Sequence, residues 1–228
     1  MFYKNFMETI PLWVYGWLSL FSGTFFYNSI MYACYNVLFT AVPIVWFAVF
    51  DWEYDKRTLL KSPILYSIGL ENIYFSSYVF WRWVVYAIWQ AALLLVLSFY
   101  IYAHPSPNGQ MGDITSTGCF VFGCIVIAVN YKLFIACTQH TWQSVTLILL
   151  SIGSYFAVFL ILDNIRIYND YGTFQVLFVE PISYFAIVFF TFSYVLIDAG
   201  AKFANSTVTS WYIKRKSVLI NKQKRVAL

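Results

Sequence analysis

The feature that most constrains this chain is an uncharged run of 21 residues, from position 30 to position 50. A helix of about 20 apolar residues crosses the hydrocarbon core of a bilayer, so this run is long enough to span a membrane. Its middle reads Y-N-V-L-F-T-A-V-P and places Asn36, Thr40 and Pro43 at the depth of the lipid tails. Polar groups are costly there, and they are typical of a transport path rather than of a plain anchor.

Further hydrophobic runs along the chain predict an all-α membrane protein. Hydrophobic residues make up 61% of the sequence and charged residues only 11%, whereas an ordinary soluble domain has about 25% charged residues. The expected segments cover residues 10–21, 30–50, 78–103, 119–137, 145–162 and 181–197. The first is short, with Lys4 and Glu8 ahead of it. The prediction is therefore a helical bundle of five full transmembrane helices plus one partial N-terminal helix.

The basic residues predict the orientation of these helices. Ten of the fourteen Lys and Arg residues lie in the loop 51–77 or in the tail 198–228, whereas the loop 104–118 contains none. The positive-inside rule assigns the basic side to the cytosol. We therefore expect a multi-pass integral membrane protein with a cytosolic loop at 51–77 and a basic cytosolic tail at 198–228. The cluster 214–216 either binds anionic lipid or, more commonly for such clusters, only sets the topology.

Motifs for catalysis are missing from the sequence. It contains no glycine-rich phosphate loop, zinc-binding helix pair, nucleophile elbow or D-K-T-G motif, so this chain could not hydrolyse ATP alone. Cys34, Cys119, Cys124 and Cys137 fall within the expected spans without ligand spacing, which predicts small buried side chains rather than a disulfide or a metal site. We expect no catalytic, cofactor-binding or metal-binding residues, and no nucleic-acid partner.

Several motifs occur in a consistent order along the chain. They are F-Y-K-N at 2–5, F-S-G at 21–23, Y-N-V-L-F-T-A-V-P at 35–43, F-D-x-E at 50–53, P-x-L-Y-x-x-G-x-x-N at 63–72, V-N-Y-K at 129–132, H-T-W at 140–142 and D-x-x-x-K-F at 198–203. Together they resemble the C-terminal membrane region of type IV P-type ATPases, which flip phospholipids. The resemblance implies that residues 1–228 correspond to the second part of the fifth span and to spans six to ten. The chain would then be a piece of a longer protein.

The resemblance also implies a function. It is that of the transmembrane part of a phospholipid translocase, which moves phospholipid from the exoplasmic to the cytosolic leaflet. ATP and Mg²⁺ would be used by domains outside this chain, and an accessory membrane subunit would accompany it. The expected location is the plasma membrane or the Golgi and endosomal membranes. An alternative stays open: a stand-alone helical membrane scaffold or subunit with no transport activity.

Five residues match the family's substrate path. Lys4 and Asn5 match the polar pair of its fifth span. On a helix, Asn36, Thr40 and Pro43 are spaced i, i+4 and i+7, so they would share one face, and Pro43 would free a backbone carbonyl near residue 39. Asn36 would either contact the lipid headgroup or only form a hydrogen bond with a neighbouring helix.

Two other polar groups of residues need separate interpretations. Asn130 and Lys132 also match the family, but Lys132 lies near the end of its span, where it can reach the interface or pair with an acid, so a structural role is favoured. In the loop after the second span, Asp51, Glu53 and Asp55 would either dock a phosphorylation domain or be solvated charges.

Overall fold

The computed structural model describes residues 2–52, 54–62, 77–102, 113–165, 171–179 and 181–226. Every regular element in these residues is a helix, which confirms the all-α prediction. Among them, five helical stretches are long and apolar enough to cross a membrane: Ser29–Phe50, Ser77–Tyr102, Ile114–Ala136, Trp142–Asp163 and Pro181–Gly200. The five predicted spans are confirmed, and the chain is a multi-pass integral membrane protein.

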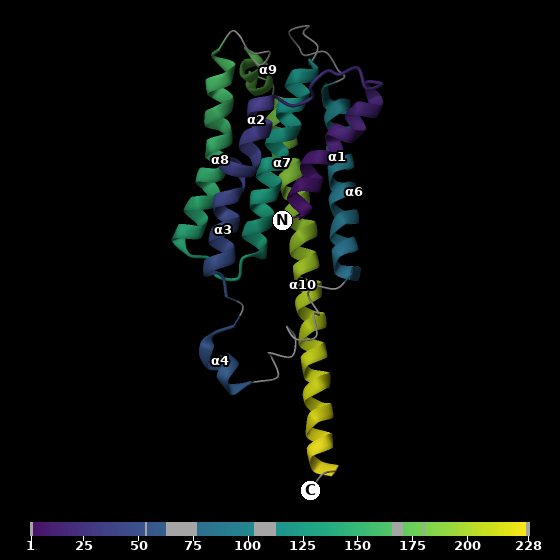
Figure 1. Cartoon of the computed structure of the whole chain (residues 1–228), viewed down its shortest axis with the longest axis vertical. Helices are drawn as coiled ribbons and strands as arrows, with labels where there is room; N and C mark the ends of the chain where they lie inside the picture. Colours follow the sequence, from purple (N-terminus) through teal and green to yellow (C-terminus); the bar gives the residue numbers. More distant parts are fainter. Residues whose placement is uncertain are drawn as a thin grey trace.

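The partial N-terminal helix differs from its predicted bounds. Helix α1 (Phe2–Leu18) begins eight residues before the predicted segment and includes Lys4 and Glu8, which are both buried. It ends at Leu18, because Leu20 and Phe21 adopt left-handed φ angles of 52° and 53°. The bounds 10–21 were therefore wrong. Hydropathy places charged residues outside a span, whereas here neighbouring helices cover them. Figure 1 shows the N-terminus at mid-height of the bundle.

The second span is built from three pieces. They are α2 (Ser29–Cys34), the π-helical turn η1 (Tyr35–Phe39) and α3 (Ala41–Phe50). Asn28 starts the span because its side-chain oxygen accepts a hydrogen bond from the Ile30 amide at 2.8 Å. The π turn precedes Pro43, which has no N–H to offer the carbonyl four residues earlier. The second span therefore crosses the membrane with an irregular turn near its middle, where the α-helical periodicity is interrupted.

Helix α7 (Ile114–Ala136) lies at the centre of the bundle (Figure 1). It contacts α1 and α3 as well as α6 (Ser77–Tyr102), α8 (Trp142–Asp163), α9 (Thr173–Val179) and α10 (Pro181–Val226). Its N-terminus is capped by Asp113, whose carboxylate accepts a hydrogen bond from the Ile114 amide at 2.7 Å. Because α7 is surrounded, most of its side chains are buried, and the rings of Tyr35 and Tyr155 pack on Phe122. Helix α9 was not predicted.

Helix α10 (Pro181–Val226) continues far beyond the predicted end of the last span at residue 197. Residues 198–226 of the expected tail are helical, and the first turns of this extension pack on the end of α7. Figure 1 shows that the C-terminal part of α10 and the short helix α4 (Lys56–Lys61) project from the same end of the bundle. The basic loop and the basic tail therefore share one end. Glu53, Ala103 and the motif at 63–72 lie outside the described residues.

Candidate functional site

A buried lysine joins α1 to the π turn in the middle of the bundle. The Lys4 side chain is 6% exposed, and its Nζ donates a hydrogen bond to Thr40 Oγ1 at 2.8 Å. The Thr40 hydroxyl donates in turn to the Tyr35 carbonyl at 2.7 Å, and the Tyr35 hydroxyl donates to the Lys4 carbonyl at 2.9 Å. The structure thus brings two of the predicted path residues, Lys4 and Thr40, into direct contact.

The break at Pro43 frees a backbone carbonyl, as predicted. The Phe39 oxygen accepts hydrogen bonds from Asn130 Nδ2 at 2.9 Å and from the Ser151 hydroxyl. Both donors are buried, so α7 and α8 supply the bonds that the helix lacks. Unpaired backbone groups are costly in a bilayer, and such bonds allow an irregular turn to persist there. Asn130 therefore has a structural contact, in line with the role favoured for it.

Asn36 does not share the face of Thr40 and Pro43. Thr40 and Pro43 are buried, whereas Asn36 is exposed on the surface of the described structure. The prediction of one common face was wrong, because the π turn closes its bonds from i to i+5 and shifts the phase that a regular α-helix would keep. Asn5 is also exposed, since neighbouring residues of a helix point in different directions. Both amides therefore face outward from the described structure.

Glu8 is a buried group that the sequence analysis did not select. It lies one turn after Lys4 on α1, and its side chain is 2% exposed. Its Oε1 atom has no hydrogen-bond partner among the described residues, nor has the hydroxyl of the buried Tyr27. The i, i+4 spacing from Lys4 was the signal available in the sequence, because residues at that spacing share one helix face.

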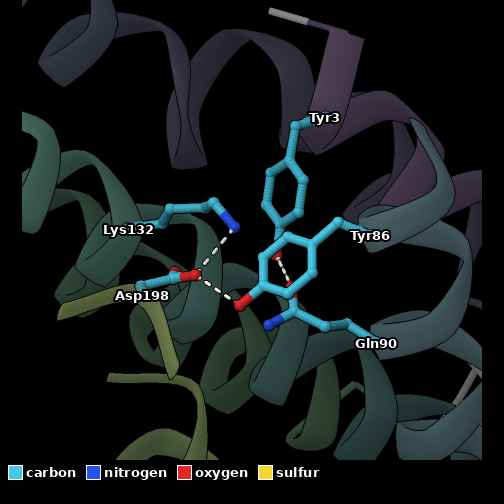
Figure 2. Close-up of polar contacts among 5 residues, drawn as sticks. All are labelled: Tyr3, Tyr86, Gln90, Lys132 and Asp198. Carbon is cyan, nitrogen blue, oxygen red and sulfur yellow. Dashed lines mark hydrogen bonds and ion pairs between the residues drawn. The ribbon is translucent and has the colours of Figure 1, made fainter. Parts of the chain in front are cut away.

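A second polar cluster holds Lys132 at the junction of four helices. Its Nζ lies 3.2 Å from Asp198 Oδ1 and 3.7, 4.1 and 4.7 Å from the ring centroids of Tyr3, Tyr86 and Trp83. Figure 2 shows Tyr86 and Lys132 meeting at the Asp198 carboxylate, which accepts a hydrogen bond from the Tyr86 hydroxyl. Lys132 thus pairs with an acid, one of the two outcomes expected for it.

The same cluster includes a buried amide. The Tyr3 hydroxyl donates to Gln90 Oε1, as Figure 2 shows, and the Tyr194 hydroxyl donates to the Gln90 carbonyl at 3.0 Å. Helices α1, α6, α7 and α10 therefore meet through polar side chains. None of these partners was predicted, because hydropathy does not say which helices face one another.

Beside this cluster lies a cavity with a volume of about 580 Å³. It is bounded by α6, α7 and α10, and its wall is mostly apolar. The polar side chains that line it are Arg82, Tyr86, Lys132, Asp198 and Lys202. Lys202 Nζ already donates to the Cys137 carbonyl at 3.2 Å, so this lysine joins the start of the α10 extension to the end of α7.

Asp51 has a structural partner that neither earlier interpretation foresaw. Its carboxylate accepts hydrogen bonds from the backbone amides of Thr138 and Gln139, each at 3.0 Å, and so ties the end of α3 to the α7–α8 link. Burial and the nearby Asp51 carboxylate raise the pKa of the Cys137 thiol, which therefore stays protonated. Docking of another domain on this loop stays a prediction.

The described residues contain no group of three or more His, Cys, Asp or Glu side chains close enough to hold a metal ion. What the geometry does contain is charged and amide side chains between apolar helices. Such groups in spanning helices mark the pathways of transporters, because a plain anchor gains nothing from their cost. Fold and site therefore define a polytopic helical membrane protein with charged and amide side chains buried between its spans.

The comparison with protein families specifies this class. A family model described as the C-terminal region of phospholipid-translocating P-type ATPases matches residues 1–211, and the chain belongs to that family. This confirms the resemblance inferred from the motifs.

Relatives come from plants and fungi. The chain is 29% identical over 163 residues to phospholipid-transporting ATPase 6 of Arabidopsis thaliana. The aligned segment covers 71% of this chain and 13% of the relative. It is 31% identical over 150 residues to phospholipid-transporting ATPase DRS2 of Saccharomyces cerevisiae, covering 64% of this chain and 11% of the relative. The chain therefore spans only about an eighth of the length of these relatives, within their membrane part.

Proposed function

We propose that this chain forms part of the membrane path along which a P-type ATPase moves phospholipid from the exoplasmic to the cytosolic leaflet. The observation that carries the proposal is the contact between the Lys4 ammonium and Thr40, buried beside a π turn at mid-height of the bundle. An ammonium at that depth suits the phosphate of a passing headgroup. Pro43 supports the path by producing the break in the helix.

Asn5 and Asn36 complete the proposed path. Both amides are exposed on the described surface, and each lies next in sequence to a residue of the Lys4 contact network. Their amide groups could bond phosphate or ester oxygens without adding charge. On this proposal the headgroup moves along the surface of α1 and η1, with its phosphate near Lys4.

Other parts of the proposed protein follow from its relatives. Hydrolysis of ATP with Mg²⁺ would take place in domains outside this chain, because P-type ATPases couple transport to that reaction. An accessory membrane subunit and a place in the plasma membrane or in the Golgi and endosomal membranes belong to the same proposal. So does a cytosolic position for the loop 51–77 and for the C-terminus, which the excess of basic residues supports.

The test uses the protein as its host makes it. With a C-terminal affinity tag added at the gene's own locus, the protein is purified with any accompanying chains and reconstituted into liposomes that contain fluorescent phospholipids. We expect ATP-dependent movement of lipid between the leaflets. Lys4→Met should lower its rate by about tenfold or more, the effect of removing one charge-assisted hydrogen bond.

Lys61→Met is the matched control, since Lys61 is exposed on α4 and far from the path. It should leave lipid movement unchanged. If the wild-type protein moves no lipid in the presence of ATP, or if Lys4→Met is as active as wild type, the proposal fails. The first result would favour the alternative of a membrane scaffold.

A further inference from the structure

The end of α3 is attached to the α7–α8 link by hydrogen bonds rather than by close packing. Asp51 follows the last residue of α3, and its carboxylate accepts bonds from the backbone amides of Thr138 and Gln139, each at 3.0 Å. Bonds to a charged acceptor are stronger than bonds between neutral groups. A cavity of about 150 Å³ lies beside them, with Trp46 and Phe50 in its wall. Because packing is incomplete here, the carboxylate is the group that fixes this helix end.

The α7–α8 link is itself held by a second helix. Lys202, in the extension of α10, donates a hydrogen bond to the Cys137 carbonyl at 3.2 Å and another to the Ile135 carbonyl. These carbonyls belong to the end of α7, where the last carbonyls of a helix have no partners inside the helix. The link is therefore a fixed point, tied to α7 and α10, and the end of α3 is attached to it.

Helix α3 is a short rod with an attachment at each end. It begins after Thr40, whose φ of −140° is not helical, and it ends at Asp51, whose ψ of 140° is extended. At the first end, side chains of α7 and α8 bond the Phe39 carbonyl, and at the second end the α7–α8 link bonds the Asp51 carboxylate. A helix of this length spans about 15 Å. A displacement of one end of α3 therefore reaches the other end.

The far end of this rod carries the contact on which the proposed path depends. Thr40 accepts the hydrogen bond from Lys4 at 2.8 Å, and it lies directly before the first residue of α3. Without the carboxylate at the other end, α3 would be held only at the break, and its swing would carry Thr40 away from Lys4. The Asp51 carboxylate thus acts on the path from the opposite end of the helix.

We propose that Asp51 is a positioning residue for lipid movement: by fixing the end of α3 it keeps Thr40 against Lys4, and so ties lipid movement to ATP hydrolysis. The proposal rests on the proposed function, in which ATP is hydrolysed in domains outside this chain. It adds a residue that acts through α3 and not by contact with the headgroup. The loop 51–77 begins at this residue, so a force transmitted along that loop acts on the same hydrogen bonds.

Lipid movement and ATP hydrolysis, measured in the same liposomes, test this role. The tagged protein is purified with any accompanying chains, and the readout is the amount of fluorescent phospholipid moved per ATP hydrolysed. Asp51→Ala removes both hydrogen bonds, and we expect this ratio to fall by about tenfold while ATP hydrolysis continues. Asp51→Asn keeps an oxygen that accepts the same bonds, and should bring the ratio to within about threefold of wild type.

A second variant removes a donor instead of the acceptor, and it keeps the test decisive if Asp51→Ala does not fold. Thr138→Pro lacks the amide N–H, and Cys137 before it already has the ψ of 135° that a following proline favours. The Gln139 amide still bonds the carboxylate, so the ratio should fall by about threefold.

Asp163→Ala is the matched control. Asp163 also accepts a hydrogen bond from a backbone amide, that of Phe174 at 2.8 Å, but it lies at the opposite end of the bundle (Figure 1). Its loss should lower the temperature of unfolding, because a bond to a charged group is lost. The amount of lipid moved per ATP should stay at the wild-type value, because this bond joins α8 to α9 and not α3 to the link.

Two results would overturn the proposal and leave the proposed function in place. One is a wild-type ratio in Thr138→Pro and in any folded Asp51→Ala. The other is an equal fall in Asp163→Ala, which would show that any loss of stability lowers the ratio. If the wild-type protein itself moves no lipid with ATP, the proposed function fails, and the role of Asp51 fails with it.

Discussion

At the scale of single residues, the bundle surrounds a buried lysine with one carboxylate and three aromatic rings. Lys132 has an anion on one side, Asp198 at 3.2 Å, and three aromatic rings on the others. Both members of the pair are only 9% exposed. Such a pair contributes little net stability, because desolvation offsets the attraction, but removing one member leaves the other charge buried alone.

Asp198→Asn should therefore destabilise the protein strongly. We expect a loss of about 3 kcal/mol, the lower end of the cost of breaking a buried pair, because the rings still attract the ammonium. The double variant Lys132→Met/Asp198→Leu should lose less than Asp198→Asn alone. Unfolding by SDS in mixed micelles measures both. A double variant that is less stable than Asp198→Asn would contradict the pairing.

At the scale of elements, close approach of backbones decides how α7 fits its neighbours. The carbonyl of Phe26, in the link between α1 and α2, lies against Gly118 on α7: a Cβ atom at that position would be 1.9 Å from the Phe26 oxygen. Only glycine allows this contact, because the obstacle is backbone and cannot rotate away. The aromatic core around Phe122 begins one turn further along α7.

Gly118→Ala should cost about 2–3 kcal/mol, as overpacking of a close contact does. Gly153→Ala on α8 is the matched control, since no atom lies within 4 Å of the added Cβ; there the change should be neutral or stabilising by up to about 1 kcal/mol. Thermal unfolding of the purified protein in detergent compares the two. Equal midpoints would refute the close contact between α7 and the α1–α2 link.

At the scale of the whole molecule, the arrangement of helices places the two basic segments together. The loop that contains α4 and the extension of α10 project from the same end of the bundle (Figure 1). Their shared end agrees with the distribution of Lys and Arg, which predicts that this end faces the cytosol.

Labelling of introduced cysteines tests this orientation. In sealed vesicles whose exoplasmic side faces outward, an impermeant maleimide should label Asn164→Cys at once, since residue 164 is exposed at the opposite end of the bundle. Lys61→Cys and Thr207→Cys should react only after permeabilisation, because both belong to the basic end. The sequon at 205–207 should likewise carry no glycan. Labelling of residues 61 and 207 from opposite sides would contradict the shared end.

Some local features of the proposed path could be predicted from the sequence, but the contacts between its residues could not. Pro43 predicted the free carbonyl of Phe39, since a missing N–H is a local property of the chain. Asn36 was placed on the wrong face, because the π turn inserts one residue into the helical periodicity. The sequence does not reveal this turn, since side chains of α7 and α8 donate the hydrogen bonds that its Phe39 carbonyl accepts. Glu8 was passed over because hydropathy assigns charged residues to the outside.

The sequence by itself determined the class of this protein. In a bilayer, a long run of uncharged residues forms a helix, because a helix pairs each backbone group within its own segment, and so the five spans could be predicted. The family could be recognised separately, from the order of its motifs. Only the tertiary structure decided which polar groups meet. Lys4 reaches Thr40 across 36 positions and Lys132 reaches Asp198 across 66. Such pairs depend on which helix faces lie together, and helix packing sets that arrangement.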